Sequence, residues 1–171
     1  MGTSHPESRP WIMDKIRNHK PRSILDVGAG SGTYANMLRS SGYNRATVDA
    51  VEVWKPYIQE FNLEDKYTKV YECDIRQFKK FDYDLVIFGD ILEHMNKEEA
   101  LSVWSAVSEQ AKNAVIAIPI IHYHQGAING NPYEEHVKDD WSHEEVLETF
   151  PGIIDSYRGE VVGAYWAEFT R

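Results

Sequence analysis

Glycines alternate with other residues at one point in the sequence, directly after a short apolar run. The stretch SILDVGAGSG, residues 23–32, places Gly28, Gly30 and Gly32 at every second position. Glycine tolerates positive φ angles and lets a ligand approach the backbone closely, because it has no Cβ. In open α/β sheets, ligands bind where a strand ends and its helix begins. We therefore predict a ligand-binding loop here; the alternative is a tight turn that binds nothing.

Histidine and carboxylate side chains gather in a second region. Its residues with acid–base or ligand chemistry are His122, His124, Glu134, Glu135, His136, Asp139, Asp140 and His143. Imidazole, with a pKa of about 6.5, is a general base near neutral pH, and together with carboxylates it also binds Zn or Fe. No HExxH or paired-cysteine pattern supports a metal site, so we assign no metal ligand. Long irregular loops in compact domains are usually functional, and we predict that segment 120–142 is a substrate lid.

The composition is that of an acidic chain with a single cysteine. Of 171 residues, 42% are apolar, and the formal net charge at pH 7 is −9. This charge disfavours a broad nucleic-acid surface, which needs clustered Lys and Arg. Cys73 has no second cysteine to pair with, and no apolar run is long enough to span a bilayer. We expect a reducing, cytoplasmic environment without a membrane partner, and the sequence leaves the oligomeric state open.

Alternating strand and helix patterns position these groups. Strands are predicted at 23–27, 45–52, 68–73, 83–89, 114–119, 153–158 and 161–169. Helices are predicted at 33–41, 56–62, 97–111 and 143–150, together with an N-terminal helical segment within 1–20. Regular alternation implies right-handed crossovers and a parallel sheet, whereas the tight turn at YRGEV implies a hairpin. The predicted fold is α/β: a three-layer sandwich in one domain, 1–171, with a seven-stranded, mostly parallel sheet, helices on both faces and an antiparallel C-terminal β-hairpin.

The glycine loop does not have the G-x-G-x-x-G spacing of a dinucleotide-binding turn. Its series Asp26-x-Gly28-x-Gly30-x-Gly32 resembles the first motif of the class I S-adenosylmethionine-dependent methyltransferases, and the resemblance extends over most of the chain. It implies that the loop, including Ala29, wraps S-adenosyl-L-methionine and that Asp26 faces the amino group of its methionine end. A carboxylate attracts an ammonium and repels a phosphate, so charge and resemblance agree.

The resemblance also implies an acid at the end of the second strand that binds the ribose hydroxyls. The stretch TVDAVEVWKP offers Asp49 and Glu52, which point to opposite faces of a strand. Pro56 begins the next helix, so Glu52 lies nearer the strand end and is our choice. Val53 and Trp54 follow where such enzymes pack an apolar side chain against adenine; a core role for Trp54 stays open.

Two further strand ends match the family. In YECDIRQF, Asp74 stands where the family places an acceptor for the adenine amino group, and Ile75 stands where the ring packs. In GDILEH, Gly89 and Asp90 resemble the motif whose backbone binds the methionine end of the donor. His94 follows directly, as either a general base or a packed histidine.

The resemblance implies methyl transfer to a small-molecule acceptor, by O- or N-methylation. A hydroxyl acceptor needs a base, for which His94, His124 and His136 are candidates, whereas an amine or carboxylate acceptor needs none. Two alternatives remain: a methyltransferase acting on protein or RNA, and a non-catalytic domain that binds S-adenosylmethionine. A nicotinamide oxidoreductase is a distant alternative, because the glycine spacing disfavours it.

Overall fold

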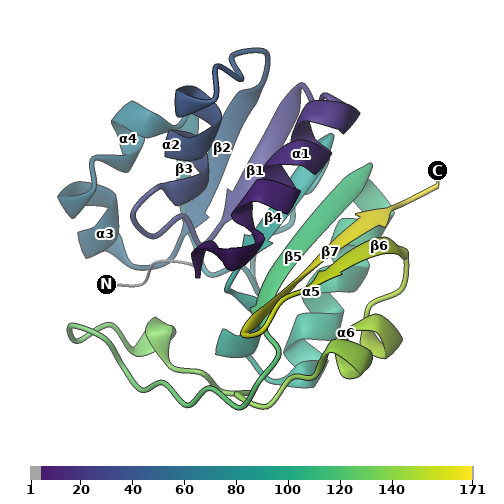
Figure 1. Cartoon of the computed structure of the whole chain (residues 1–171). Coiled ribbons are helices and arrows are strands. Elements are labelled where there is room, and N and C mark those ends of the chain that lie inside the picture. Colours follow the sequence, from purple (N-terminus) through teal and green to yellow (C-terminus); the bar gives the residue numbers. More distant parts are fainter. Residues whose placement is uncertain (1–4, 171) are drawn as a thin grey trace.

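A single twisted sheet with strand order β3-β2-β1-β4-β5-β7-β6 organises the chain (Figure 1). The computed structural model describes residues 5–170. The strands are β1 (Ser23–Val27), β2 (Thr47–Glu52), β3 (Lys69–Glu72), β4 (Leu85–Gly89), β5 (Asn113–Pro119), β6 (Ile153–Arg158) and β7 (Val162–Glu168). The first five pair in parallel, and β7 is antiparallel to both β5 and β6. The carboxyl ends of β1 to β5 therefore meet at one edge of the sheet.

Helices pack on both faces of the sheet (Figure 1). The α-helices are α1 (Arg9–His19), α2 (Thr33–Ser40), α3 (Lys55–Glu60), α4 (Leu63–Lys66), α5 (Lys97–Gln110) and α6 (His143–Thr149). Short 3-10 turns are η1 (Pro6–Ser8), η2 (Leu92–His94) and η3 (Pro132–Glu134). One hydrophobic cluster joins α5 and α6 to the sheet, and another joins α1 and α2 to its opposite face.

The period-2 alternation of the strands divides the core between these two faces. In β4, Val86 and Phe88 pack in the cluster with α5, whereas Leu85 and Ile87 pack in the cluster with α1. All four are buried. A strand covered on both faces is apolar throughout, which is why β4 gives a continuous hydrophobic run in the sequence.

The structure confirms the predicted fold class, including the antiparallel hairpin at the C-terminal end. Predicted strand and helix bounds differ from the observed ones by at most two residues. A capping box forms at Asn96 and Glu99 at the start of α5, and Ser142 caps α6. Helix α4 was not predicted, because four residues are too few for a periodic pattern. The N-terminal helical prediction is met by η1 and α1, while residues 1–4 lie outside the described part.

Segment 120–142 contains η3 as its helical turn and otherwise follows an irregular path. Backbone hydrogen bonds fold it back on itself, from Tyr123 N–H to the Asp139 carbonyl and from His136 N–H to the Gln125 carbonyl. Within residues 5–170, no helix is both long and apolar enough to cross a membrane.

Candidate functional site

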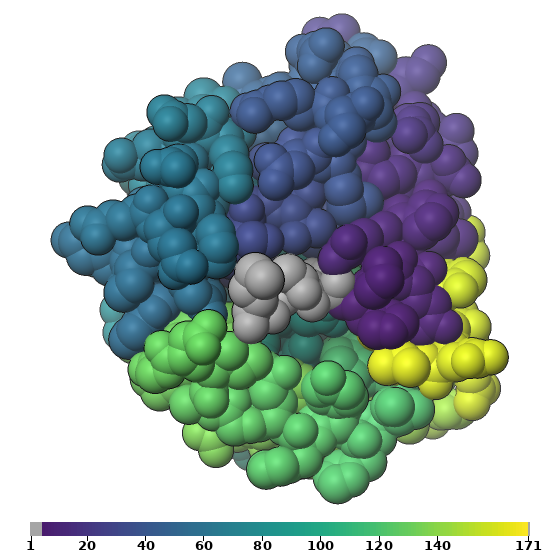
Figure 2. Space-filling view, turned by 60° about the vertical axis from the view of Figure 1, so that its left-hand side comes forward, coloured from purple at the N-terminus to yellow at the C-terminus, as the bar shows by residue number. Residues whose placement is uncertain are grey.

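A cavity of about 670 Å³ opens at the carboxyl edge of the sheet. Its lining comes from the loop after β1, the ends of β2, β4 and β5, the first turns of the chain at η1, and segment 120–142. Figure 2 shows this side of the molecule, where purple, blue and green parts of the chain approach one another. A cavity of this size accommodates a cofactor-sized ligand.

The glycine loop forms one wall of the cavity. Gly28, Ala29 and Gly30 line it, and Gly28 adopts a φ of 68°. A Cβ on Gly28 would lie 1.9 Å from Cδ1 of Ile91, so no larger residue fits without moving its neighbour. Gly32 lies outside the lining and precedes α2 as its N-cap, with a φ of 79°. The glycines thus serve two purposes: an open wall and a sharp entry into α2.

Glu52 ends β2 beside this loop and lines the cavity. Its carboxylate accepts hydrogen bonds from the backbone N–H of Gly30 at 2.9 Å and of Trp54 at 2.8 Å. The side chain is 5% exposed, and burial raises its pKa although these two N–H groups oppose the shift. Asp49 lies away from the cavity and accepts a hydrogen bond from the Tyr83 hydroxyl at 2.7 Å. The geometry therefore favours Glu52 as the acid facing a ligand.

Asp26 does not line the cavity. It is buried and accepts a hydrogen bond from the Tyr67 hydroxyl. Burial raises the pKa of Asp26 to about 7, with the Tyr67 hydrogen bond opposing the shift. The sequence predicted that Asp26 faces the amino group of the donor. In the structure, its side chain is absent from the cavity lining.

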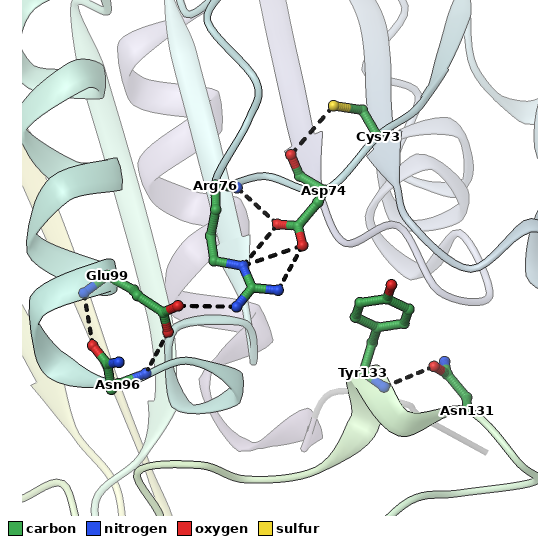
Figure 3. Close-up of polar contacts among 7 residues, drawn as sticks. All are labelled: Cys73, Asp74, Arg76, Asn96, Glu99, Asn131 and Tyr133. Carbon is green, nitrogen blue, oxygen red and sulfur yellow. Dashed lines mark hydrogen bonds and ion pairs between the residues drawn. The ribbon is translucent and has the colours of Figure 1, made fainter.

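A second, apolar cavity of about 80 Å³ adjoins the first, and the two share Gly28, Val53, Ile91, His94 and Tyr133. Asp74, Ile75 and Arg76 also line it. In Figure 3 the Arg76 guanidinium lies between Asp74 and Glu99, and the Tyr133 ring extends from segment 120–142.

The Asp74 carboxylate already has a partner in this cavity. Arg76 donates to it from Nε at 3.0 Å and from a terminal nitrogen at 2.6 Å, and these bonds lower the pKa of Asp74. Trp54 lines neither cavity; its ring centroid lies 6.3 Å from that of Tyr133. Besides the imidazole of His94, the aromatic ring that lines both cavities is that of Tyr133.

The end of β4 supplies the floor of the large cavity. Gly89 and Asp90 both line it, and a Cβ on Gly89 would lie 2.3 Å from Cε2 of Tyr34. Asp90 adopts a φ of 55° and donates its backbone N–H to the Ala117 carbonyl at 2.8 Å. A positive φ in a residue other than glycine is uncommon and is found at functional sites.

Three side chains with ligand atoms converge beside this floor. Glu93, His94 and His136 each place one such atom within 4.8 Å of the others. Burial raises the pKa of Glu93 well above its ordinary value, and nearby Asp90 adds to the shift. Burial lowers the pKa of both His94 and His136, although hydrogen bonds to backbone carbonyls oppose this. All three line the large cavity.

The third candidate base, His124, is placed elsewhere. Its side chain is 77% exposed, and its Nδ1 lies 3.3 Å from a carboxylate oxygen of Asp139. It is absent from the lining of the large cavity. The structure therefore joins two of the three predicted histidines at one site.

Arg9, Tyr34, Glu93 and Tyr133 are among the cavity-lining residues that the sequence did not single out. Glu93 could have been identified from the sequence, because it is an acid that directly precedes His94 shortly after the end of β4. Tyr34 and Arg9 lie on helices where a side chain facing a ligand has the same spacing as one facing the core. No sequence pattern distinguishes them.

Carboxylates dominate the charge of the large cavity. Glu52, Asp90, Glu93 and Glu134 line it against one guanidinium, that of Arg9. S-adenosylmethionine carries a sulfonium and an ammonium, and a negative wall suits both. The glycine wall and the carboxylate of Glu52 fit the donor that the resemblance implies.

Comparisons with known proteins agree with this architecture. The model of the methyltransferase-domain family matches residues 25–110, which make up half of the chain and include the glycine loop, β2 and β4. A ubiquinone biosynthesis O-methyltransferase from Rickettsia typhi is 26% identical over 145 residues, which cover 72% of this chain and 58% of that protein. The chain thus spans well under two thirds of this relative's length.

Solved structures show the same fold at low identity. The methyltransferase domain of a bacterial protein named CtHen1 has a TM-score of 0.69 at 12% identity, covering 96% of this chain and 98% of that one. A 1,6-didemethyltoxoflavin N1-methyltransferase from Burkholderia thailandensis, solved with S-adenosylhomocysteine, has a TM-score of 0.65 at 16% identity. The match covers 95% of this chain and 78% of that one. Family match, strand order and site geometry lead to one conclusion: the chain belongs to the methyltransferase-domain family and has the fold of the class I S-adenosylmethionine-dependent methyltransferases.

Proposed function

We propose that this chain transfers a methyl group from S-adenosylmethionine to the oxygen of a small-molecule hydroxyl acceptor. The observation that carries the proposal is the cavity of about 670 Å³, which is lined both by Glu52 and the glycine loop and by Glu93, His94 and His136. One cavity thus offers a place for a donor and a place for an acceptor. The match to an O-methyltransferase supports the choice of oxygen.

The donor is assigned to the side formed by the ends of β1 and β2. Glu52 accepts the ribose hydroxyls, the backbone of Gly28 to Gly30 lies along the methionine end, and Arg9 offers a guanidinium for the carboxylate. The adjoining apolar cavity takes the adenine, with Val53 and Ile75 as its walls. S-adenosylmethionine supplies a methyl group that is already activated as a sulfonium.

The chain's own contribution is placement and the exclusion of water. Methyl transfer needs the acceptor oxygen in line with the S–CH₃ bond at about 3 to 3.5 Å. The new bond forms between oxygen and methyl carbon, the bond from carbon to sulfur breaks with its electron pair going to sulfur, and the acceptor loses its hydroxyl proton. We assign the loss of that proton to the part of the cavity lined by Glu93, His94 and His136.

The acidic lining supports a methyl donor rather than a nicotinamide dinucleotide. A dinucleotide carries two phosphates, which negatively charged carboxylates in the lining repel, whereas the sulfonium is attracted. The donor, a small-molecule acceptor and a cytoplasmic location are proposed together. The cytoplasmic location is supported by Cys73, which has no second cysteine in the chain with which to form a disulfide.

Calorimetric titration of the purified chain tests the donor. We expect S-adenosylhomocysteine to bind with a micromolar Kd and NAD to bind far more weakly. Release of S-adenosylhomocysteine during incubation with panels of phenols, sugars, amines, peptides and RNA then identifies the acceptor class. Tighter binding of NAD would contradict the proposal, and turnover on RNA or peptide alone would replace its acceptor. Donor binding without turnover on any class would favour a sensor.

The His136→Ala variant separates the acceptor side from the donor side. We expect the affinity for S-adenosylhomocysteine to stay within twofold of wild type, because His136 is absent from the lining of the adjoining cavity that we assign to the adenine. Turnover should fall by about 100-fold, in the range of lost acid–base or activating groups. A variant with full turnover would remove His136 from the reaction.

A further inference from the structure

Glu93 is a buried acid whose carboxylate oxygens make no hydrogen bond to another described residue. It is 1% exposed and lines the large cavity, and neither of its carboxylate oxygens has a hydrogen-bond partner within residues 5–170. Removing a carboxylate from water without compensation is costly, and buried charges are normally paired or bound to a metal. The position therefore calls for a positively charged partner.

Two imidazoles beside Glu93 are held in the orientation of metal ligands. Nδ1 of His94 lies 3.1 Å from the Glu135 carbonyl, and Nδ1 of His136 lies 2.7 Å from the Tyr123 carbonyl. A carbonyl oxygen only accepts, so Nδ1 carries the hydrogen and the neutral ring presents its lone pair at Nε2. Histidines that bind metals generally donate their other N–H in this way, which fixes the ring.

The backbone also holds the ligand-bearing segments together. The Glu93 carbonyl accepts the N–H groups of Val137 at 2.9 Å and Lys138 at 3.1 Å, which anchors the stretch that carries His136 next to η2. Ligand atoms of the three side chains lie within 4.8 Å of one another. Bonds of about 2.0 to 2.2 Å to one ion would separate them by roughly 3 to 3.5 Å, which small side-chain rotations achieve.

We propose that Glu93, His94 and His136 bind one divalent transition-metal cation in the large cavity, with its remaining positions directed at the methyl acceptor. Two imidazoles and one carboxylate are a donor set for Zn²⁺, Mn²⁺, Fe²⁺ or Co²⁺. Asp90 and Glu134 line the same cavity and add negative charge. This assigns a metal site where the sequence analysis assigned none.

The role of the cation rests on the proposed function. A hydroxyl bound to a divalent ion loses its proton more readily, as metal-bound water does. The acceptor proton then passes to water while the bond from oxygen to methyl forms and the bond from carbon to sulfur breaks. An oxygen acceptor is favoured over a protonated amine, which the ion repels. The two histidines act as ligands here rather than as bases.

A second group of histidines provides a matched control. His122 Nε2 and His124 Nδ1 lie 3.4 and 3.3 Å from the Asp139 carboxylate, but their side chains are 73% and 77% exposed. Exposed groups of this kind are satisfied by water. The double variant His122→Ala/His124→Ala removes as many imidazoles as His94→Ala/His136→Ala does.

The test uses Co²⁺ as the ion, because its visible absorption reports its ligands. The full chain is first treated with a chelator and then titrated with Co²⁺, followed by competition with Zn²⁺ and Mn²⁺. We expect one equivalent to bind with the absorption of mixed nitrogen and oxygen ligands. Glu93→Gln and His136→Ala should each weaken binding at least tenfold, whereas the double variant of His122 and His124 should bind as wild type.

Donor binding keeps this inference separate from the proposed function. S-adenosylhomocysteine titrated into the metal-free chain should bind with unchanged affinity, and the same titration shows that each variant is folded. No Co²⁺ binding by a chain that binds S-adenosylhomocysteine overturns the metal site and leaves the histidines as bases. Loss of Co²⁺ binding only in the variant of His122 and His124 also overturns it. Co²⁺ binding without donor binding would instead contradict the proposed function.

Discussion

Replacing Glu52 with alanine tests how the end of β2 holds the donor. A carboxylate has about four lone-pair positions, and two of them accept the N–H groups of Gly30 and Trp54. Two positions remain, one for each ribose hydroxyl. A hydrogen bond to a charged group contributes about 1.5 to 3 kcal/mol. Because water and the freed N–H groups compensate in part, we expect a total loss of about 1.5 to 3 kcal/mol, or about 10- to 150-fold in Kd.

Calorimetric titration with S-adenosylhomocysteine measures this loss, and Asp49→Ala is its control. Asp49 accepts the Tyr83 hydroxyl on the far side of β2, so its removal should lower the melting temperature without changing donor affinity more than twofold. Glu52→Gln keeps one acceptor oxygen and should give an intermediate affinity. Equal losses in Glu52→Ala and Asp49→Ala, or a larger loss in Asp49→Ala, would refute the assignment of the ribose to Glu52.

Three further changes test other parts of the site. Gly28→Ala brings a Cβ against Ile91 and should weaken S-adenosylhomocysteine binding at least tenfold by titration, whereas Gly126→Ala, with open space around it, should not. Tyr133→Ala removes the ring that reaches both cavities and should weaken the same binding by about 2- to 10-fold, with Tyr133→Phe near wild type; equal losses would deny the ring a role. Asp26→Asn should change how the free energy of unfolding depends on pH. The pKa of Asp26 is about 7 in the folded protein against an ordinary value of 3.8, so the free energy of unfolding of wild type is highest below pH 3.8 and falls as the pH rises from there through 7. Chemical unfolding at about pH 5 and pH 8 should show wild type losing about 2 to 3 kcal/mol more than the variant, and parallel pH profiles would contradict the raised pKa.

The sheet could be predicted from the sequence because its strands are buried on both faces. Continuous apolar runs such as Leu85–Gly89 alternate with segments of helical periodicity. This alternation predicts a parallel sheet whose two faces are both covered by helices. The hairpin at the end followed from a connection too short for a crossover. Helix α4 could not be predicted, because tertiary contacts rather than periodicity stabilise four helical residues.

The part of the cavity lining that lies at strand ends could be predicted from the sequence, whereas the part contributed by segment 120–142 could not. Gly28, Glu52 and Gly89 lie at strand ends. Parallel strands bring their carboxyl ends together at one edge of the sheet, independently of the conformation of the loops. His136 reaches His94 through the path of an irregular segment, which no periodic pattern encodes. His124 stands in the same segment, and only the fold distinguishes it from His136.

Two buried carboxylates show why residue type alone does not identify a site. Asp26 and Glu93 are each 1% exposed, and both have raised pKa values. Asp26 accepts a hydrogen bond from the hydroxyl of Tyr67, is absent from the cavity lining and can remain protonated at little cost. Glu93 lines the cavity beside two imidazoles and has no hydrogen-bond partner among residues 5–170. An ionised acid that lacks such a hydrogen bond next to a cavity is stabilised when a cation binds, which is the physical basis of the metal site proposed for Glu93.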